Sequence, residues 1–192
     1  MITNICVLRS GGEYKPEHVI RLSKQVPDLV CISDVTVKGV RTIPLLHGWQ
    51  NWWCKIELFR PDIKGDLFYL DLDTTVIKMP KMPQRDTVLN DFGLPTVIAS
   101  GLMYLTENKR AEVWELFNKN PLQVMKEHEK WGVNRGAGDG GFLQQFYKGA
   151  QRWQKIAKVY SYKIHCKKGI PDDADIICYH GYPKPWHLEN EV

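Results

Sequence analysis

Short apolar runs alternate with helical repeats along the first part of the chain. The apolar runs at residues 5–8, 29–34 and 67–76 are bounded by glycine, proline or charged residues, a pattern typical of buried strands. Apolar residues recur at helical spacing over about residues 16–26 and 49–59, so a helix is predicted in each of these segments. This alternation predicts an α/β fold, in which helices flank a mixed, mostly parallel central sheet.

The second part of the chain continues the alternation. A strand-like run at residues 97–105 is interrupted by Ser100 and Gly101, and a glycine within a strand often marks the close approach of a ligand or of another backbone. Helices are predicted over residues 107–118 and from Asp139 onward, and a last strand is predicted over residues 174–179.

The composition is that of a globular protein with a mild positive charge. The 192 residues are 43% hydrophobic, carry a formal net charge of +4 and are divided by no linker or repeat. We therefore expect a single domain over residues 1–192 with its own core. The basic residues do not gather into one segment, which argues against a nucleic-acid partner, whereas a small positive balance suits an anionic small ligand. No apolar run is long enough to span a membrane.

The cysteines predict a reducing environment. There are five of them, which is an odd number, and they include no C-x-x-C pair. No secretory signal comes before the first predicted strand. We therefore expect reduced thiols and a cytoplasmic protein rather than a disulfide framework.

Two carboxylates end the third apolar run. Asp71 and Asp73 alternate along the predicted strand, so their side chains are expected to point the same way, about 6.6 Å apart. Two carboxylates this close repel each other unless a cation or a proton lies between them. Ligands commonly bind at the carboxyl ends of strands in α/β sheets. The pattern therefore indicates a divalent-cation site facing a cleft, although two solvated acids at a strand end would give the same pattern.

A histidine and a lysine near the C-terminal end add to this constellation. His180 follows the last predicted strand, and carboxylates with one imidazole suit Mn²⁺, with Mg²⁺ as the alternative. Lys184 lies four residues further on, between two prolines, where its charge could neutralise a diphosphate. A lone His-Gly pair is usually only a turn, so the specific feature is its pairing with the two aspartates.

The tryptophans at positions 49, 52 and 53 fall on the apolar stripe of the helix predicted at residues 49–59. Core packing is the expected role of most of these rings. Lys55 lies on the same helix but away from the stripe.

With these motifs the chain resembles the GT-A glycosyltransferases, and among them the family of glycogenin-like and bacterial lipooligosaccharide galactosyltransferases. The resemblance covers almost the whole chain, and its motifs follow in the same order. They are Lys55, the strand that reads FYLDLD at residues 68–73, Ser100 with Gly101, Asp139 at a helix start, and the segment from His180 to Trp186.

The resemblance implies transfer of a sugar from a nucleoside diphosphate sugar, with UDP as the expected nucleotide, to an unknown acceptor. It implies Asp71, Asp73 and His180 as metal ligands, and Asp139 and Lys55 as catalytic residues. The donor-binding residues that it implies are Tyr14, Asp34, Lys55, Asp71, Ser100, Gly101 and Lys184.

The chain departs from the family pattern at three places. His180 is two residues closer to Lys184 than in the family, Ser100 replaces an asparagine, and Gly140 replaces the glutamine that follows Asp139. These departures leave the acceptor and the stereochemical course of transfer open.

Two other functions fit parts of the sequence. Residues 71–75 also match the D-x-D-x-T motif of the haloacid-dehalogenase-like phosphatases, in which the first aspartate is a nucleophile and the second a general acid. That motif normally follows the first strand of its domain, whereas two strands and two helices are predicted before it here. A non-catalytic module that binds nucleotide sugars is the second alternative.

Overall fold

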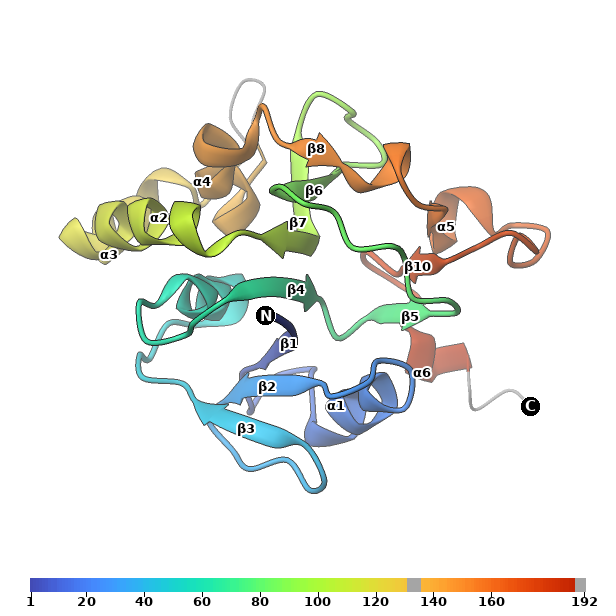
Figure 1. Ribbon diagram of the computed structural model, residues 1–192, viewed down its shortest axis with the longest axis horizontal. Helices are drawn as coiled ribbons and strands as arrows, with labels where there is room; N and C mark the ends of the chain where they lie inside the picture. The colour runs from blue at the N-terminus through green and yellow to red at the C-terminus, as the bar shows by residue number, and fades with distance from the viewer. Residues whose placement is uncertain (131–135, 189–192) are drawn as a thin grey trace.

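The computed structural model describes residues 1–130 and 136–188. A seven-stranded sheet forms the centre of this structure (Figure 1). Its strand order is β3 (Arg41–Pro44), β2 (Val30–Ser33), β1 (Ile2–Leu8), β4 (Asp66–Leu70), β7 (Ile98–Leu105), β6 (Thr87–Asn90) and β8 (Gln151–Arg152). The first four strands in this order are parallel, β7 is antiparallel to both of its neighbours, and β8 is parallel to β6. The predicted mixed, mostly parallel sheet is confirmed, with the strand before Asp71 in its middle.

A second, smaller sheet lies beside the first, and one of its strands comes from the segment that was predicted as a single strand. It consists of β5 (Thr74–Val76), β10 (Ile176–Cys178) and β9 (Val159–Ser161), with β10 in the middle. The run at residues 67–76 is therefore two strands in two different sheets, and the prediction of a single strand is wrong. Asp71, Leu72 and Asp73 form the link between the sheets, where the alternation of side chains along a strand does not apply.

The helices cover the sheet on both sides. They are α1 (Pro16–Ser23), the 3₁₀ helix η1 (Asn51–Phe59), α2 (Glu107–Lys119), α3 (Pro121–Glu127), α4 (Gly138–Tyr147), the 3₁₀ turn η2 (Trp153–Lys155), α5 (Tyr162–His165) and α6 (Pro185–Leu188). In Figure 1, α2, α3 and α4 lie together at one flank, while α5, α6 and the small sheet lie at the opposite flank. Among the described residues, no helix combines the length and apolarity that a bilayer crossing needs.

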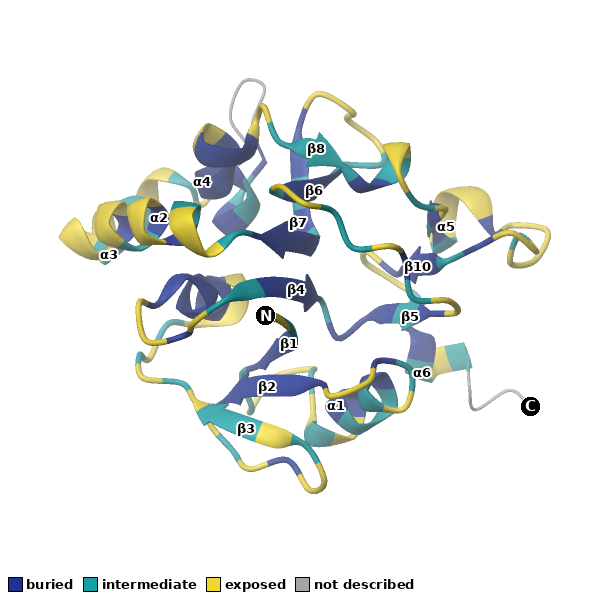
Figure 2. Ribbon diagram, viewed as in Figure 1, coloured by how far each residue is buried: buried dark blue, intermediate teal, exposed yellow. Residues whose placement is uncertain are grey.

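Alternate side chains of the central strands enter two different cores. On β1, Ile5 and Val7 pack into a cluster with η1, α2 and α4, whereas Cys6 and Leu8 pack into a cluster with α1 and the small sheet. Strands buried on both faces read as continuous apolar runs, which is why the sequence predicts them well. Figure 2 shows this burial along β1, β2 and β4, in contrast to the exposed outer faces of α2 and α3.

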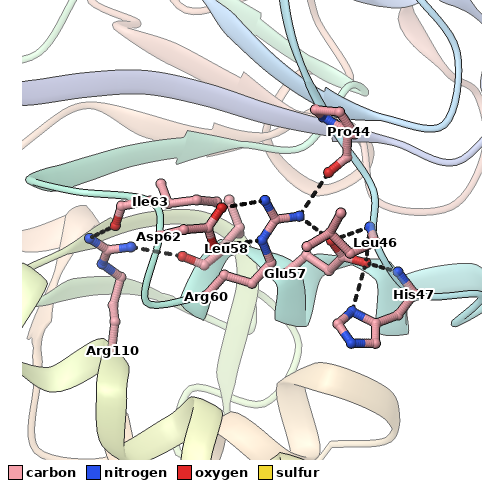
Figure 3. A network of polar contacts seen from close by, with 9 residues as sticks. All are labelled: Pro44, Leu46, His47, Glu57, Leu58, Arg60, Asp62, Ile63 and Arg110. Atoms are coloured by element: carbon pink, nitrogen blue, oxygen red, sulfur yellow. Dashed lines mark hydrogen bonds and ion pairs between the residues drawn. The ribbon is translucent and has the colours of Figure 1, made fainter.

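A buried polar network fixes η1 against the sheet (Figure 3). The carboxylate of Glu57 is fully buried and accepts hydrogen bonds from the backbone N–H groups of Leu46 and His47 and from the Arg60 guanidinium, at 2.7–3.0 Å. Arg110 of α2 donates to the carbonyl oxygens of Leu58 and Ile63, each at 2.9 Å. These bonds tie the C-terminal part of η1 and the residues that follow it to neighbouring segments, so this end of the short helix has a defined position.

Candidate active site

A cleft of about 710 Å³ opens where the loop after β1, the start of η1, the end of β4 and the start of α4 meet. Its walls include residues 9–14, 50–52, 54 and 55, together with Tyr69, Asp71 and Asp139. The cleft lies beyond the carboxyl ends of the parallel strands β1 and β4, the usual place for a ligand in an open α/β sheet.

The first cluster in the cleft centres on Lys55. The Lys55 ammonium lies 3.2 Å from a carboxylate oxygen of Asp71 and 3.2 Å from one of Asp139, and it donates to the Ser100 hydroxyl at 3.1 Å. Burial alone would lower the pKa of Lys55, but the carboxylates of Asp139 and Asp71 outweigh this effect and raise it. The lysine is therefore a fixed positive charge between two carboxylates that come from different elements.

The backbone around Gly101 completes the first cluster. The Asp71 amide donates to the Gly101 carbonyl at 2.8 Å. A Cβ atom on Gly101 would lie 3.1 Å from a carboxylate oxygen of Asp71, so only glycine leaves that carboxylate its full space. The interrupted strand predicted at residues 97–105 is one continuous strand, and its two small residues make room for Lys55 and Asp71.

The second cluster centres on Lys184. Its ammonium forms a buried ion pair with Asp73 and donates to the Tyr14 hydroxyl at 3.1 Å. The Tyr14 hydroxyl in turn donates to Asp73 at 3.0 Å. Burial and the nearby Asp71 charge raise the pKa of Asp73, while Lys184 opposes this rise. Residues 14, 73 and 184, which are far apart in the sequence, thus meet at one point beside the cleft.

Two residues that the sequence analysis missed hold the aspartates in place. The buried Tyr69 hydroxyl donates to the Asp71 carboxylate. Arg21 of α1 donates to the carbonyl oxygens of Leu72 and Thr74, at 3.1 and 2.6 Å, and so fixes the link between the sheets. Tyr69 lies inside the motif that carries the resemblance, but its apolar neighbours suggested only a core position.

Asp34 lies apart from both clusters. It follows β2 and accepts hydrogen bonds from the backbone and the hydroxyl of Ser10, at 2.8 and 2.9 Å. Burial alone would raise the pKa of Asp34, but the two bonds from Ser10 outweigh this effect and lower it. Because Ser10 lines the cleft, Asp34 shapes the cleft wall from behind.

His180 is engaged elsewhere in this structure. Its Nε2 atom and the Ser161 hydroxyl are 2.6 Å apart, and its ring stacks on Phe92 at a centroid distance of 5.5 Å. Desolvation lowers the pKa of His180 below its usual range, so the neutral ring can accept the Ser161 hydrogen bond. The expected convergence of His180 with the two aspartates is thus not seen in this conformation.

The donor set for a metal is only partly assembled. Over residues 1–130 and 136–188, no three His, Cys, Asp or Glu side chains come together in a way that could hold a metal ion. Asp71 and Asp73 provide the carboxylate oxygens that a hard divalent cation requires, but each is paired with a lysine. The metal site of Asp71, Asp73 and His180 therefore stays a prediction.

Comparisons with solved structures, but not with sequences, show which known fold this chain shares. Neither a protein-family model nor a curated protein sequence matches the chain. Among solved structures, the glycosyltransferase GlyE from Streptococcus pneumoniae TIGR4 is similar over 97% of this chain and 57% of its own, with a TM-score of 0.63 and 16% identity. This chain thus spans little more than half of the GlyE chain.

Two further structures are similar over nearly their whole length. An active-site mutant of LgtC matches over 100% of this chain and 91% of its own, with a TM-score of 0.61 and 11% identity. Mouse xyloside xylosyltransferase 1 matches over 93% of this chain and 97% of its own, with a TM-score of 0.52 and 10% identity. The architecture seen here is therefore the fold of the GT-A glycosyltransferases.

Proposed function

We propose that this protein is a glycosyltransferase that moves a sugar from a nucleoside diphosphate sugar, with UDP as the nucleotide, to an acceptor. The observation that carries this proposal is the presence of two lysine–carboxylate clusters, one in the cleft and one beside it, in this fold. Each lysine is buried by its partners and therefore positioned, which suits recognition of a charged ligand better than flexible surface lysines would.

The two clusters suit the two ends of a donor. We assign the Lys184 ammonium, next to the Tyr14 hydroxyl, to the diphosphate, where it would stabilise the charge that develops as the diphosphate leaves. We assign Lys55 and Asp139 to the transferred sugar, because they form the most buried polar pair that lines the cleft. Ser100 and Gly101 position Lys55 and Asp71, and Asp34 supports the loop that would contact the nucleoside.

The proposed reaction exchanges one bond at the anomeric carbon of the sugar. The bond from this carbon to the diphosphate oxygen breaks, and UDP leaves with the electron pair. A bond from the anomeric carbon to an acceptor oxygen forms, and the acceptor loses its proton to a base. Asp139 is the carboxylate of this chain that we assign to that proton.

We further propose that a divalent cation, Mn²⁺ or Mg²⁺, binds at Asp71 and Asp73, with His180 as a third ligand. When bound, such an ion would help to neutralise the diphosphate. Binding of the ion requires Lys184 to move from Asp73 to the diphosphate, and His180 to leave Ser161.

The five cysteines are all free and buried, which supports our proposal of a cytoplasmic location.

A screen of nucleotide sugars tests the proposed function. Thermal stabilisation and release of nucleoside diphosphate are measured for the purified protein with and without Mn²⁺. We expect stabilisation by a UDP-sugar in the presence of the ion, its loss in Asp73→Asn, and weaker nucleotide binding in Lys184→Ala. Asp173→Asn, a change in an exposed ion pair away from the cleft, serves as the control.

The two alternatives predict different results in this screen. A phosphatase would release phosphate from p-nitrophenyl phosphate and would not respond to any nucleotide sugar. A binding module would be stabilised by a nucleotide sugar but would release no diphosphate from it. Phosphate release without any nucleotide response would overturn the proposed function.

A further inference from the structure

Trp52 differs from its neighbours Trp49 and Trp53. Trp53 is buried, and Trp49 packs on His47 and Phe117, so both belong to the core on the η1 side of the sheet. Trp52 is 47% exposed and lines the cleft. Core packing, the expected role of most tryptophans in this segment, therefore does not explain it.

The 3₁₀ geometry of η1 explains why this ring is in the cleft. A 3₁₀ helix has three residues per turn, so side chains three residues apart share a face. Trp53, Ile56 and Phe59 follow this spacing and are buried in the core. Trp52 and Lys55 lie in the next row and both line the cleft, whereas Leu58, the last residue of that row, is buried in the core. The indole thus lies on the same face of η1 as the lysine that we assign to the transferred sugar.

Gly138 fixes the position of the indole. An added Cβ atom on Gly138 would lie 2.2–2.5 Å from three indole atoms of Trp52, and the φ angle of Gly138 is +63°, which favours glycine. The ring therefore lies directly against the backbone at the start of α4, one residue before Asp139. An aromatic ring held this way loses little further freedom when a ligand stacks on it.

The surroundings of the ring suit a sugar. A pyranose presents a C–H face, which packs on an aromatic ring, and a rim of hydroxyl groups, which need hydrogen-bond partners. Gln50 and Asn51 line the cleft together with Trp52 and supply amide groups of this kind. Pockets that combine an aromatic wall with a few polar groups are typical of small-molecule sites.

The depth of the site separates the two sugars of a transfer. Lys55 and Asp139 are 8% and 4% exposed and suit the donor sugar, which is tethered to its nucleotide inside the cleft. Trp52, at 47% exposure, suits the molecule that arrives from solvent. We infer that Trp52 is a stacking platform for a pyranose ring of the acceptor, so that the acceptor is a glycan or glycoside; the term acceptor rests on the proposed function.

The experiment follows the indole N–H signals of ¹⁵N-labelled protein by NMR. The signal that is missing from Trp52→Phe belongs to Trp52, and the signal of Trp114, a half-buried tryptophan outside the cleft, is assigned in the same way with Trp114→Phe. Methyl β-galactopyranoside and methyl α-glucopyranoside are the probes, added with and without UDP. We expect at least one of them to shift the Trp52 signal and to leave the Trp114 signal in place.

Affinity is then measured by saturation transfer from the protein to the same glycosides. Trp52→Ala should bind them about two- to tenfold more weakly, the range expected for loss of one aromatic contact, and Trp52→Phe should recover part of this loss. Trp114→Phe should bind them as the unmodified protein does. Sorbitol, an acyclic polyol, should produce no shift, because it lacks a ring face.

Three results would overturn the inference: no glycoside shifts the Trp52 signal, sorbitol shifts it equally, or uridine alone shifts it while the glycosides do not. The last result would assign the ring to the nucleoside. The proposed function is checked separately by UDP-sugar stabilisation of the same samples. Glycoside binding at Trp52 without a nucleotide response would refute the proposed function and retain a sugar site, and the reverse result would refute only the sugar site.

Discussion

The buried pair between Glu57 and Arg60 offers a sharp test of how η1 is held. Glu57→Gln keeps the size of the side chain but removes the charge that faces Arg60, and it places an amide N–H near the N–H groups of Leu46 and His47. The two side chains are 0% and 3% exposed, so water does not replace the lost partner. Removing one partner of such a pair costs about 3–5 kcal/mol.

In Glu57→Gln the Arg60 guanidinium keeps a second partner, Asp62, which limits the expected fall in the free energy of unfolding. Its guanidinium also donates to Asp62 at 3.0 and 2.7 Å, so we expect the free energy of unfolding to fall by about 3 kcal/mol, the lower end of that range. For a chain of this length 1 kcal/mol shifts the melting temperature by about 2–4 °C, which predicts a fall of roughly 6–12 °C. Urea and thermal unfolding followed by circular dichroism measure both quantities.

A matched control uses an exposed ion pair. Lys158 and Asp173 are 3.4 Å apart, and their side chains are 62% and 54% exposed. Solvent screens this pair, so Asp173→Asn should change the unfolding free energy by less than about 1 kcal/mol. If Glu57→Gln is no less stable than Asp173→Asn, the network in Figure 3 does not hold η1 in the way described.

Three further predictions follow. Gly101→Ala should weaken UDP-sugar binding in a titration while changing stability little. The added Cβ atom would lie 3.1 Å from a carboxylate oxygen of Asp71 and would displace this carboxylate; unchanged binding would refute the prediction. Ser161→Ala should lower the unfolding free energy by about 1 kcal/mol, because Ser161 caps α5 and bonds His180, and should strengthen Mn²⁺ binding in a direct titration if His180 is a ligand. Burial raises the pKa of Cys54 to about 12 and also raises the pKa of Cys178, so both thiols stay protonated near neutral pH and become reactive only as the pH rises. A thiol reagent at about pH 8 should therefore label all five cysteines only after unfolding. Rapid labelling of the native protein would contradict this prediction.

The sequence predicts the central strands because burial on both faces leaves a local signal. The apolar runs of β1, β2 and β4 are each visible without knowledge of their partners. The strands β3, β6, β8 and β9 are not predicted: each has four residues or fewer, and β8 pairs with residues more than 60 positions away in the chain. Pairing at that distance is a property of the folded chain and leaves no periodic pattern.

The candidate site was predictable as a set of residue types but not as a set of contacts. Lys55 and Asp71 are expected at the donor and Asp139 as a catalytic residue, and the structure joins the three side chains. The pairing of Lys184 with Asp73 spans 111 positions in the sequence and could not be read locally. The exposure of Trp52 was missed because the apolar stripe at residues 49–59 fits an α-helix, whereas the 3₁₀ geometry turns this ring out of the core.

The central claim is that Lys184 and its partners bind the diphosphate of a nucleotide donor. Titration calorimetry with UDP and with uridine, on the unmodified protein and on Lys184→Ala in the presence of Mn²⁺, tests it most directly. A hydrogen bond to a charged group contributes about 1.5–3 kcal/mol, so we predict that Lys184→Ala binds UDP roughly 10- to 150-fold more weakly and binds uridine, which lacks phosphate, unchanged. Equal UDP affinity in the two proteins, or an equal loss of uridine and UDP binding, would contradict the account.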